Sequence, residues 1–277
     1  MLYLMLAILS SALVSIIMRL STDRVKGNAG MLAFNYLMCT AIAVMFTGCK
    51  NLFPSGEGLL STLGFGGING FLYLASFLLL QYNVKKNGVV LSATFMKLGL
   101  LVPMVLSIVL FHEMPGVLQW VGFGLAIAAI LLINFKKNTS EKFFPDLILL
   151  LIGGGLGDAM AKVFEELGVV GMSEQFLFYT FLTALLLCTV LTLFRKEKVG
   201  KSELFFGLLI GVPNFFSARF LLLALSEVAA VIVYPTYSVA SLFAVTLAGV
   251  IFFKEKLQKK QWIAIGVILV ALVLLNV

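Results

Sequence analysis

The sequence predicts an all-α membrane protein with ten transmembrane helices, arranged as two inverted five-helix repeats. Three observations lead to this prediction. Of the 277 residues, 61% are hydrophobic and only 12% are charged, whereas roughly a quarter of a soluble domain is charged. Ten apolar runs alternate with short polar breaks, and the second half of the chain repeats the pattern of the first. The composition excludes a soluble enzyme, a disordered chain and an ordinary nucleic-acid-binding protein.

Each apolar run is long enough to cross a bilayer as a helix, which needs about 20 apolar residues. The runs do not alternate between apolar and polar residues, so helices are favoured over a β-barrel. The weakest break is Leu225–Ala229, where only Ser226 and Glu227 interrupt the apolar residues. In order, the runs lie near residues 2–19, 31–48, 59–81, 88–111, 117–135, 146–165, 175–194, 204–226, 229–253 and 261–277.

Lysine and arginine residues predict the orientation of these helices. Sixteen of them lie in the odd-numbered connections, and the even-numbered connections hold only Lys50. Because basic loops stay in the cytoplasm, we expect a multi-pass protein of the cell (inner) membrane with cytoplasmic odd-numbered loops and both termini outside. The net charge of +7 is then a topology signal and does not require a nucleic-acid partner.

An internal repeat divides the chain into residues 1–137 and residues 138–277. Each half holds five spans, an odd number, so the second half enters the membrane inverted, which is a common plan for secondary transporters. A duplicated scaffold without a transport role is the alternative interpretation. The matching positions are Arg19 with Lys162, Tyr36 with Tyr179, Asn69 with Asn214, Glu113 with Glu255, Gln119 with Gln261, Trp120 with Trp262 and Gly124 with Gly266.

The end of each half carries a Glu, a Gln–Trp pair and a Gly four residues after the Trp. Residues Ala230–Thr236 read Ala-x-x-Val-Tyr-Pro-Thr. On these motifs and the five-plus-five plan, the whole chain resembles the ten-helix EamA-like branch of the drug/metabolite transporter superfamily. The resemblance implies that four helices of each half surround a central cavity while the fifth lies outside. It also implies that spans 1, 3, 4, 6, 8 and 9 line that cavity.

Three ionisable residues lie deep inside predicted spans: Lys97, Asp158 and Arg219. Such residues normally face the bundle interior or water because their burial in lipid is costly. Counted at 1.5 Å per residue, all three fall within about 10 Å of one another in depth. We expect a site for an anion or a zwitterion, in which Arg219 holds a carboxylate and Asp158 holds an amine or a proton. The alternative is a structural Lys97–Asp158 pair, with Arg219 reaching outward.

Neutral polar residues at helical spacing complete the expected substrate site. Asn69 and Tyr73 share a face of the third span, Asn214 lies in the eighth, and Tyr234 and Tyr237 lie in the ninth. In a membrane such residues either line a cavity or join helices by hydrogen bonds. We expect the two asparagines to line the cavity and the tyrosines to form its apolar wall.

Two prolines and two basic residues are candidates for hinges or gates. Pro213 and Pro235 interrupt the eighth and ninth spans, as Pro103 interrupts the fourth, and each removes a backbone donor. We interpret Pro213 and Pro235 as hinges beside the site, with a packing kink as the alternative. Lys162 and Arg19 lie near span ends, where a capping or gating ion cluster is more plausible than substrate contact.

We therefore expect a secondary transporter for a small polar organic solute, with an amino acid or organic acid favoured, that works by alternating access and is coupled to protons or works by exchange. A multidrug or lipid-head-group exporter is one alternative, and a non-transporting membrane subunit or intramembrane enzyme is another. No phosphate loop or metal-ligand spacing occurs in the sequence, so we expect no enzyme activity, cofactor or metal. The expected partners are the solute and membrane lipid, for a monomer or homodimer.

Overall fold

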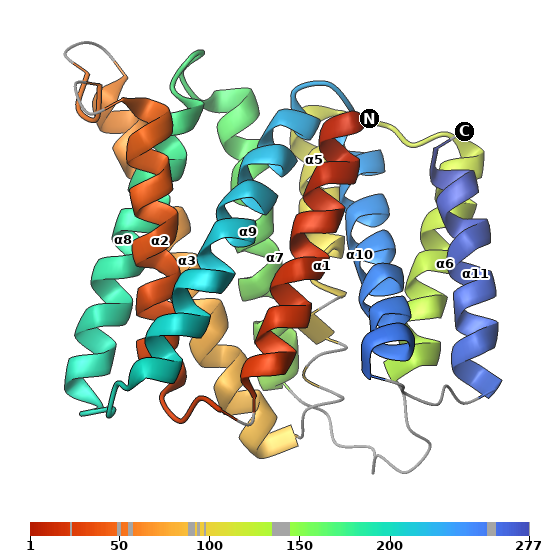
Figure 1. Cartoon of the computed structure of the whole chain (residues 1–277). Coiled ribbons are helices and arrows are strands. Elements are labelled where there is room, and N and C mark those ends of the chain that lie inside the picture. Colours follow the sequence, from red (N-terminus) through yellow and green to blue (C-terminus); the bar gives the residue numbers. More distant parts are fainter. Residues whose placement is uncertain are drawn as a thin grey trace. The chain divides into compact units, whose positions relative to one another are not determined.

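The computed structural model is all-helical, with ten helices and no strand among the residues it describes (Figure 1). This confirms the predicted fold class. The described residues are 1–22, 24–48, 51–54, 58–87, 92, 95–96, 98–134, 145–253 and 259–276.

The helices follow the predicted apolar runs. Seven of the described helices, α1, α2, α3 and α7 to α10, are long and apolar enough to cross a membrane, and the apolar parts of α5, α6 and α11 are shorter. Their bounds are α1 Leu2–Ser21, α2 Asn28–Thr47, α3 Leu59–Asn87, α5 Leu101–Phe111, α6 Val117–Asn134, α7 Pro145–Leu167, α8 Ser173–Phe194, α9 Lys201–Leu225, α10 Ala230–Phe253 and α11 Lys259–Leu275.

Two local features of the sequence explain helix boundaries. The weakest predicted break is real, because α9 ends at Leu225 and α10 begins at Ala230. The fourth span is interrupted beside Pro103, as expected: Gly99 and Leu100 form a turn between the helical residue Leu98 and the start of α5. Pro103 itself lies in the first turn of α5, where a missing backbone donor removes no intrahelical bond. Pro213 and Pro235, in contrast, lie inside α9 and α10.

The chain forms two compact units, and each takes helices from both halves of the sequence. Unit 1 comprises Met1–Leu74 and Val163–Ser226, and unit 2 comprises Ala75–Lys162 and Glu227–Val277. Unit 1 therefore holds α1, α2, α8 and α9, with the start of α3 and the end of α7. Unit 2 holds the remaining parts of α3 and α7 together with α5, α6, α10 and α11.

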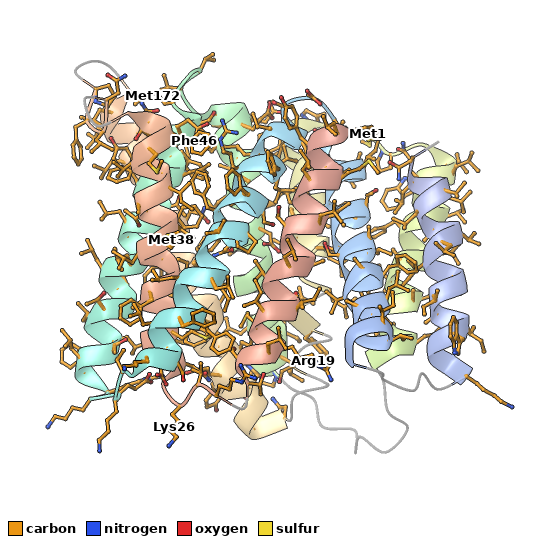
Figure 2. All side chains as sticks on the ribbon, in the orientation of Figure 1. Met1, Arg19, Lys26, Met38, Phe46 and Met172 are labelled. Carbon is orange, nitrogen blue, oxygen red and sulfur yellow. The ribbon has the colours of Figure 1, made fainter. Side chains whose placement is uncertain are left out.

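Within unit 1, the second helices of the two halves, α2 and α8, pack side by side in opposite directions (Figure 1). The backbone N–H of Ala29, at the start of α2, donates to Glu197, which lies just beyond the end of α8. At the other end, the Tyr179 hydroxyl near the start of α8 donates to the Leu52 carbonyl, which follows α2. Figure 2 shows Lys26 and Phe46 at opposite ends of unit 1. Equivalent helices thus run in opposite directions, as an inverted repeat requires.

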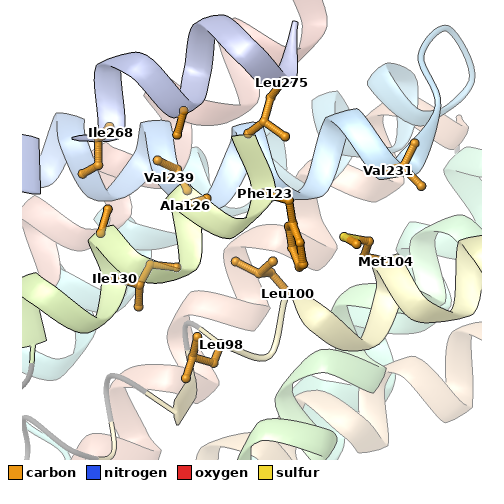
Figure 3. Close-up of a cluster of buried hydrophobic side chains, with 12 residues drawn as sticks. Leu98, Leu100, Met104, Phe123, Ala126, Ile130, Val231, Val239, Ile268 and Leu275 are labelled. Atoms are coloured by element: carbon orange, nitrogen blue, oxygen red, sulfur yellow. The ribbon is translucent and has the colours of Figure 1, made fainter. Parts of the chain in front are cut away.

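Unit 2 repeats this relationship with the last two helices of each half. A Cβ placed on Gly122 of α6 would lie 3.0 Å from the backbone nitrogen of Leu275, the last residue of α11, so α6 and α11 are antiparallel. The N–H of Val231 at the start of α10 donates to Glu113, which follows α5. Apolar residues from these helices and from the chain just before α5 form the core of unit 2 (Figure 3): Leu98, Leu100, Met104, Phe123, Ala126, Ala129, Ile130, Val231, Val239, Ile268, Ala271 and Leu275.

Pairs of glycines four residues apart determine which helices of unit 1 approach closely. Gly66 and Gly70 of α3 lie against α8, and a Cβ on Gly66 would lie 2.6 Å from that of Tyr179. Gly207 and Gly211 of α9 lie against α2 in the same way. The third helix of each half therefore packs through its glycines on the second helix of the other half. This is close helix packing of the kind that small residues permit in membranes.

Candidate functional site

Arg219 of α9 forms an ion pair with Glu174 in the first turn of α8. The Nη2 and Nε atoms of Arg219 lie 2.7 and 2.8 Å from Oε1 of Glu174. The guanidinium carbon lies 4.4 Å from the ring centroid of Phe46, within the range of a cation–π interaction. The start of α8 also favours a carboxylate because the helix dipole is positive there. The ion pair with Glu174, the contact with the Phe46 ring and the position of Glu174 at the start of α8 together hold the Arg219 side chain in place.

This pairing places Arg219 at the level of the first turn of α8. The side chains of Arg219 and Glu174 are 23% and 26% exposed. The second oxygen of Glu174, Oε2, is buried and has no hydrogen-bond partner among the described residues. The guanidinium thus has a protein carboxylate beside it, and an anionic solute at Arg219 would have to displace or share that partner.

A polar network joins Asn214 of α9 to α2 in the interior of unit 1. The Asn214 Nδ2 atom donates to Oδ1 of Asn35 at 3.2 Å and approaches Sγ of Cys39 at 3.7 Å. The Cys39 thiol in turn donates to the carbonyl oxygen of Gly211. These bonds cross the glycine-packed contact between α9 and α2. In this structure Asn214 joins two helices by hydrogen bonds, which is the alternative to the cavity-lining role expected for it.

Asn69 of α3 makes the equivalent connection to α8. Its Nδ2 atom lies 3.4 Å from the Thr180 hydroxyl, and its Oδ1 atom is buried without a partner among the described residues. Tyr73, one turn further along α3, has its ring centroid 6.4 Å from those of Tyr36 and Phe181. Both predicted residues of the third span therefore contact helices of unit 1.

A cavity of about 210 Å³ lies within unit 1, between the ends of α7 and α9 and the start of α8. Its lining residues include Glu165, Ser173 and Ser226, together with the apolar residues Phe164 and Leu222. This volume is below the roughly 300 Å³ of pockets for drug-sized ligands. It has room for water molecules or a small metabolite.

Asp158 lies near the middle of α7, in unit 2, and its side chain is exposed. The exposed apolar residues Ile148, Leu149, Ile152 and Leu156 occupy an arc of about 100° around this helix, and Asp158 lies outside it, about 80–180° from each of them at 100° per residue. The backbone carbonyl of Asp158 accepts a hydrogen bond of 2.9 Å from the Tyr234 hydroxyl of α10. The carboxylate thus lies off the apolar stripe that suits lipid.

One turn further along α7, Lys162 is only 4% exposed. Its Nζ atom lies 3.0 Å from Oε1 of Glu113, which follows α5, and 5.7 Å from the ring centroid of Phe111. The other oxygen of Glu113 accepts from the Val231 N–H at 3.2 Å. Lys162 therefore pairs with an acid that lies just beyond the end of α5, and its expected gating role stays a prediction.

The remaining predicted residues are placed as follows. Arg19 is exposed near the end of α1, and Tyr237 is half-buried in α10. The helices continue through Pro213 and Pro235. Lys97 lies outside the described residues, so its expected pairing with Asp158 or with a solute stays a prediction.

Sequence reasoning missed the acidic partners of the two basic residues. Glu174 was not selected because it lies outside the middle of a span, and Glu113 was noted only as a repeat marker. A usable signal was present, since a buried cation requires a nearby carboxylate. Both acids lie at helix ends facing the end of another helix. Their pairing with Arg219 and Lys162 depends on packing between helices.

Two further carboxylates cap the start of α2. Oε1 of Glu203 accepts from the backbone N–H groups of Lys26 and Gly27 at 2.9 and 3.2 Å. Oε2 of Glu197 accepts from those of Ala29 and Gly30 at 3.0 and 3.3 Å. The first N–H groups of a helix have no partner within it. Glu197 from the α8–α9 connection and Glu203 from the first turn of α9 supply acceptors at this helix start and fix this end of unit 1.

Three similarities to known proteins accompany this geometry. The sequence profile of the EamA-like transporter family matches residues 1–135 and again residues 147–277. An uncharacterized protein of Haemophilus influenzae (strain ATCC 51907 / DSM 11121 / KW20 / Rd) is 25% identical over 277 residues, which cover 95% of this chain and 93% of that protein. A solved crystal structure has a TM-score of 0.77 and 13% sequence identity, covering 99% of this chain and 94% of that one. The last similarity shows the fold alone.

Proposed function

Because the chain belongs to the EamA-like transporter family, we propose that this membrane transporter is a secondary transporter that moves a small polar organic solute by alternating access. The observation that carries the proposal is the antiparallel packing of equivalent helices within each unit. Inverted repeats can exchange their conformations, which opens a site to either side of the membrane in turn. We take residues 1–137 and 138–277 as the two repeats.

The solute class is argued from the charges of the described residues. Arg219 has Glu174 beside it, and Asp158 is an exposed carboxylate near the middle of a helix and outside the arc of its exposed apolar residues. An intramembrane carboxylate in such a position is typical of a cation or proton pathway. We propose that Asp158 binds the amine of the solute or the coupling proton. Tyr234, whose hydroxyl donates to the Asp158 carbonyl, and Tyr237 on the same helix remain predicted contributors. An amino acid or related amine is thus favoured over an organic acid without an amine.

Arg219 then has a gating role in this proposal. Its pairing with Glu174 joins the end of α9 to the start of α8, and breaking this pair would free both helix ends. A carboxylate-bearing solute could replace Glu174 at the guanidinium, because both offer the same planar acceptor. Lys97, Asn69, Asn214 and Tyr73 remain predicted contributors to the solute site, and Pro213 and Pro235 remain predicted hinges.

The direct test is counterflow in proteoliposomes, screened against amino acids, organic acids and amines at two pH values. Asp158→Asn removes the charge without changing the side-chain shape, and we expect at least a tenfold loss of flux. Asp146→Asn is the matched control, because Asp146 lies on the same helix but pairs with Lys86 at its end. We expect this control to keep wild-type flux.

The two outcomes that contradict the proposal differ. Wild-type counterflow in the Asp158→Asn variant would remove Asp158 from the solute site while leaving transport intact. A purified, folded protein that exchanges none of the screened solutes would instead count against the transport proposal.

A further inference from the structure

Glu113 uses both carboxylate oxygens to hold two separate elements of unit 2. Oε1 pairs with Lys162 of α7 at 3.0 Å, and Oε2 accepts from the Val231 N–H of α10 at 3.2 Å. Glu113 itself belongs to the chain after α5, in the first half of the sequence, whereas α7 and α10 belong to the second half. One side chain thus connects the two repeats.

The Lys162 contact depends on the charge of Glu113. The Lys162 side chain is only 5% exposed, and an ammonium group buried to this extent is costly unless a carboxylate compensates it. The nearby Phe111 ring, 5.7 Å from Nζ, adds a weaker attraction. Neutralising Glu113 would therefore favour a conformation in which Lys162 reaches water.

The first turn of α10 depends on side chains outside the helix. Pro235 has no N–H, so the carbonyl of Val231 loses the donor that would join this turn to the next one. Two contacts hold the turn in place instead: the Val231 N–H donates to Glu113, and the Tyr234 hydroxyl donates to the Asp158 carbonyl. Tyr234 is only 2% exposed. The turn is therefore a separately supported segment that contacts the residue proposed to bind solute.

We infer that Glu113 is a positioning residue for transport. By holding Lys162 and Val231 together, it keeps the first turn of α10 against α7. A change at Asp158 is thereby coupled to the release of this turn, which opens this end of unit 2. The inference rests on the proposed function, because Asp158 is its solute or proton site. Protonation or amine binding at Asp158 shifts α7, Tyr234 transmits the shift, and release of the Glu113 contacts frees the turn.

The test measures access to position 231 and needs no identified solute. Val231 is 4% exposed, and Val231→Cys keeps the backbone N–H that Glu113 holds. In a background with Cys39→Ser, Cys49→Ser and Cys188→Ala, we expect slow reaction of V231C with a soluble thiol reagent. Adding Glu113→Gln should raise the labelling rate at least tenfold, and Asp146→Asn should leave it unchanged. An unchanged rate in E113Q would overturn the inference.

The link to Asp158 is tested by Asp158→Asn, which imitates the protonated acid. We expect this change to alter the V231C labelling rate at least threefold when Tyr234 is present, and to have no effect after Tyr234→Phe, which lacks the connecting hydroxyl. A merely structural Glu113 contact would not make the response to Asp158 depend on Tyr234. The same labelling rate in D158N and wild type, or the same response with and without Y234F, would overturn the link.

A second variant covers the case in which Glu113→Gln fails to fold. Glu113→Gln with Lys162→Met removes both charges, leaves no unpaired ammonium and keeps an acceptor for the Val231 N–H. We expect V231C in this double variant to react with the thiol reagent at least threefold faster than V231C alone. A rate equal to that of V231C alone would contradict the inference. Labelling tests the positioning role and counterflow tests transport, so the two can fail separately. Rapid labelling in E113Q together with wild-type counterflow would overturn the role of Glu113 in transport.

Discussion

Arg219 and Glu174 form a pair that crosses from the second half of α9 to the first turn of α8, with two N–H groups of the guanidinium bonded to a single carboxylate oxygen. The pair fixes the level of Arg219 within unit 1. It also changes the charges available to a solute, because Arg219, which was expected to hold the carboxylate of the solute, has its own acidic partner in Glu174. The amine-selective proposal follows from this difference.

Glu174→Gln should destabilise the protein, because Arg219 would then lack a counter-charge in a mostly buried position. We expect a loss of about 1–2 kcal/mol in the free energy of unfolding, between the values for exposed and fully buried pairs. The measurement is the thermal unfolding midpoint of the detergent-purified protein. Asp146→Asn, which breaks the exposed pair with Lys86, should change it little. Equal midpoints for E174Q and wild type would show that this pair does not support the fold.

Gly70→Ala should loosen the contact between α3 and α8, because the added methyl would lie 2.5 Å from the Thr180 carbonyl oxygen. Overpacking of this kind costs about 1–3 kcal/mol. The control is Gly67→Ala on the same helix, where nothing lies within 4 Å of the added methyl. We expect G67A to be as stable as wild type or slightly more stable, since alanine favours helix. Thermal unfolding of both variants decides this, and equal losses would contradict the close approach.

Glu203→Ala should leave the N–H groups of Lys26 and Gly27 without their acceptor. Buried donors without partners cost about 1–3 kcal/mol, and we expect a loss of unfolding free energy in that range. Glu203→Gln keeps an acceptor oxygen, so its loss should be less than half as large. Denaturation of both variants in one detergent makes the comparison. If the two losses were equal, the charge of Glu203 and not its acceptor would be what matters.

The orientation proposed from the basic loops can be tested with one cysteine on each side. Val170, in the α7–α8 connection, is 99% exposed, and Arg24 lies in the α1–α2 connection. In a cysteine-free background we expect Val170→Cys, but not Arg24→Cys, to react with a membrane-impermeant thiol reagent added to intact cells. Permeabilised cells provide the control, in which both should react. Labelling of R24C alone would reverse the proposed topology.

The helix count, the duplicated pattern and the family were all predictable from the sequence. Hydropathy and charge belong to each stretch of chain by itself, so runs of about 20 apolar residues predict spans wherever they pack. Even the weak break at Ser226 was correctly identified. The interruption of the fourth span at Pro103 was predicted too, but its exact position was not: a proline is tolerated in the first turn of a helix, so the break lies just before it, at Gly99 and Leu100.

The sequence by itself thus determined the all-helical class, the two repeats and the ionisable residues that any site must accommodate. Only the tertiary structure decided which of them pair: Glu113 with Lys162, and Glu174 with Arg219. The physical reason is that a pair depends on the rotation and depth of two helices far apart in the chain. Those are fixed by side-chain packing between helices, such as the contacts of Gly66 and Gly70 with α8, which no local pattern records.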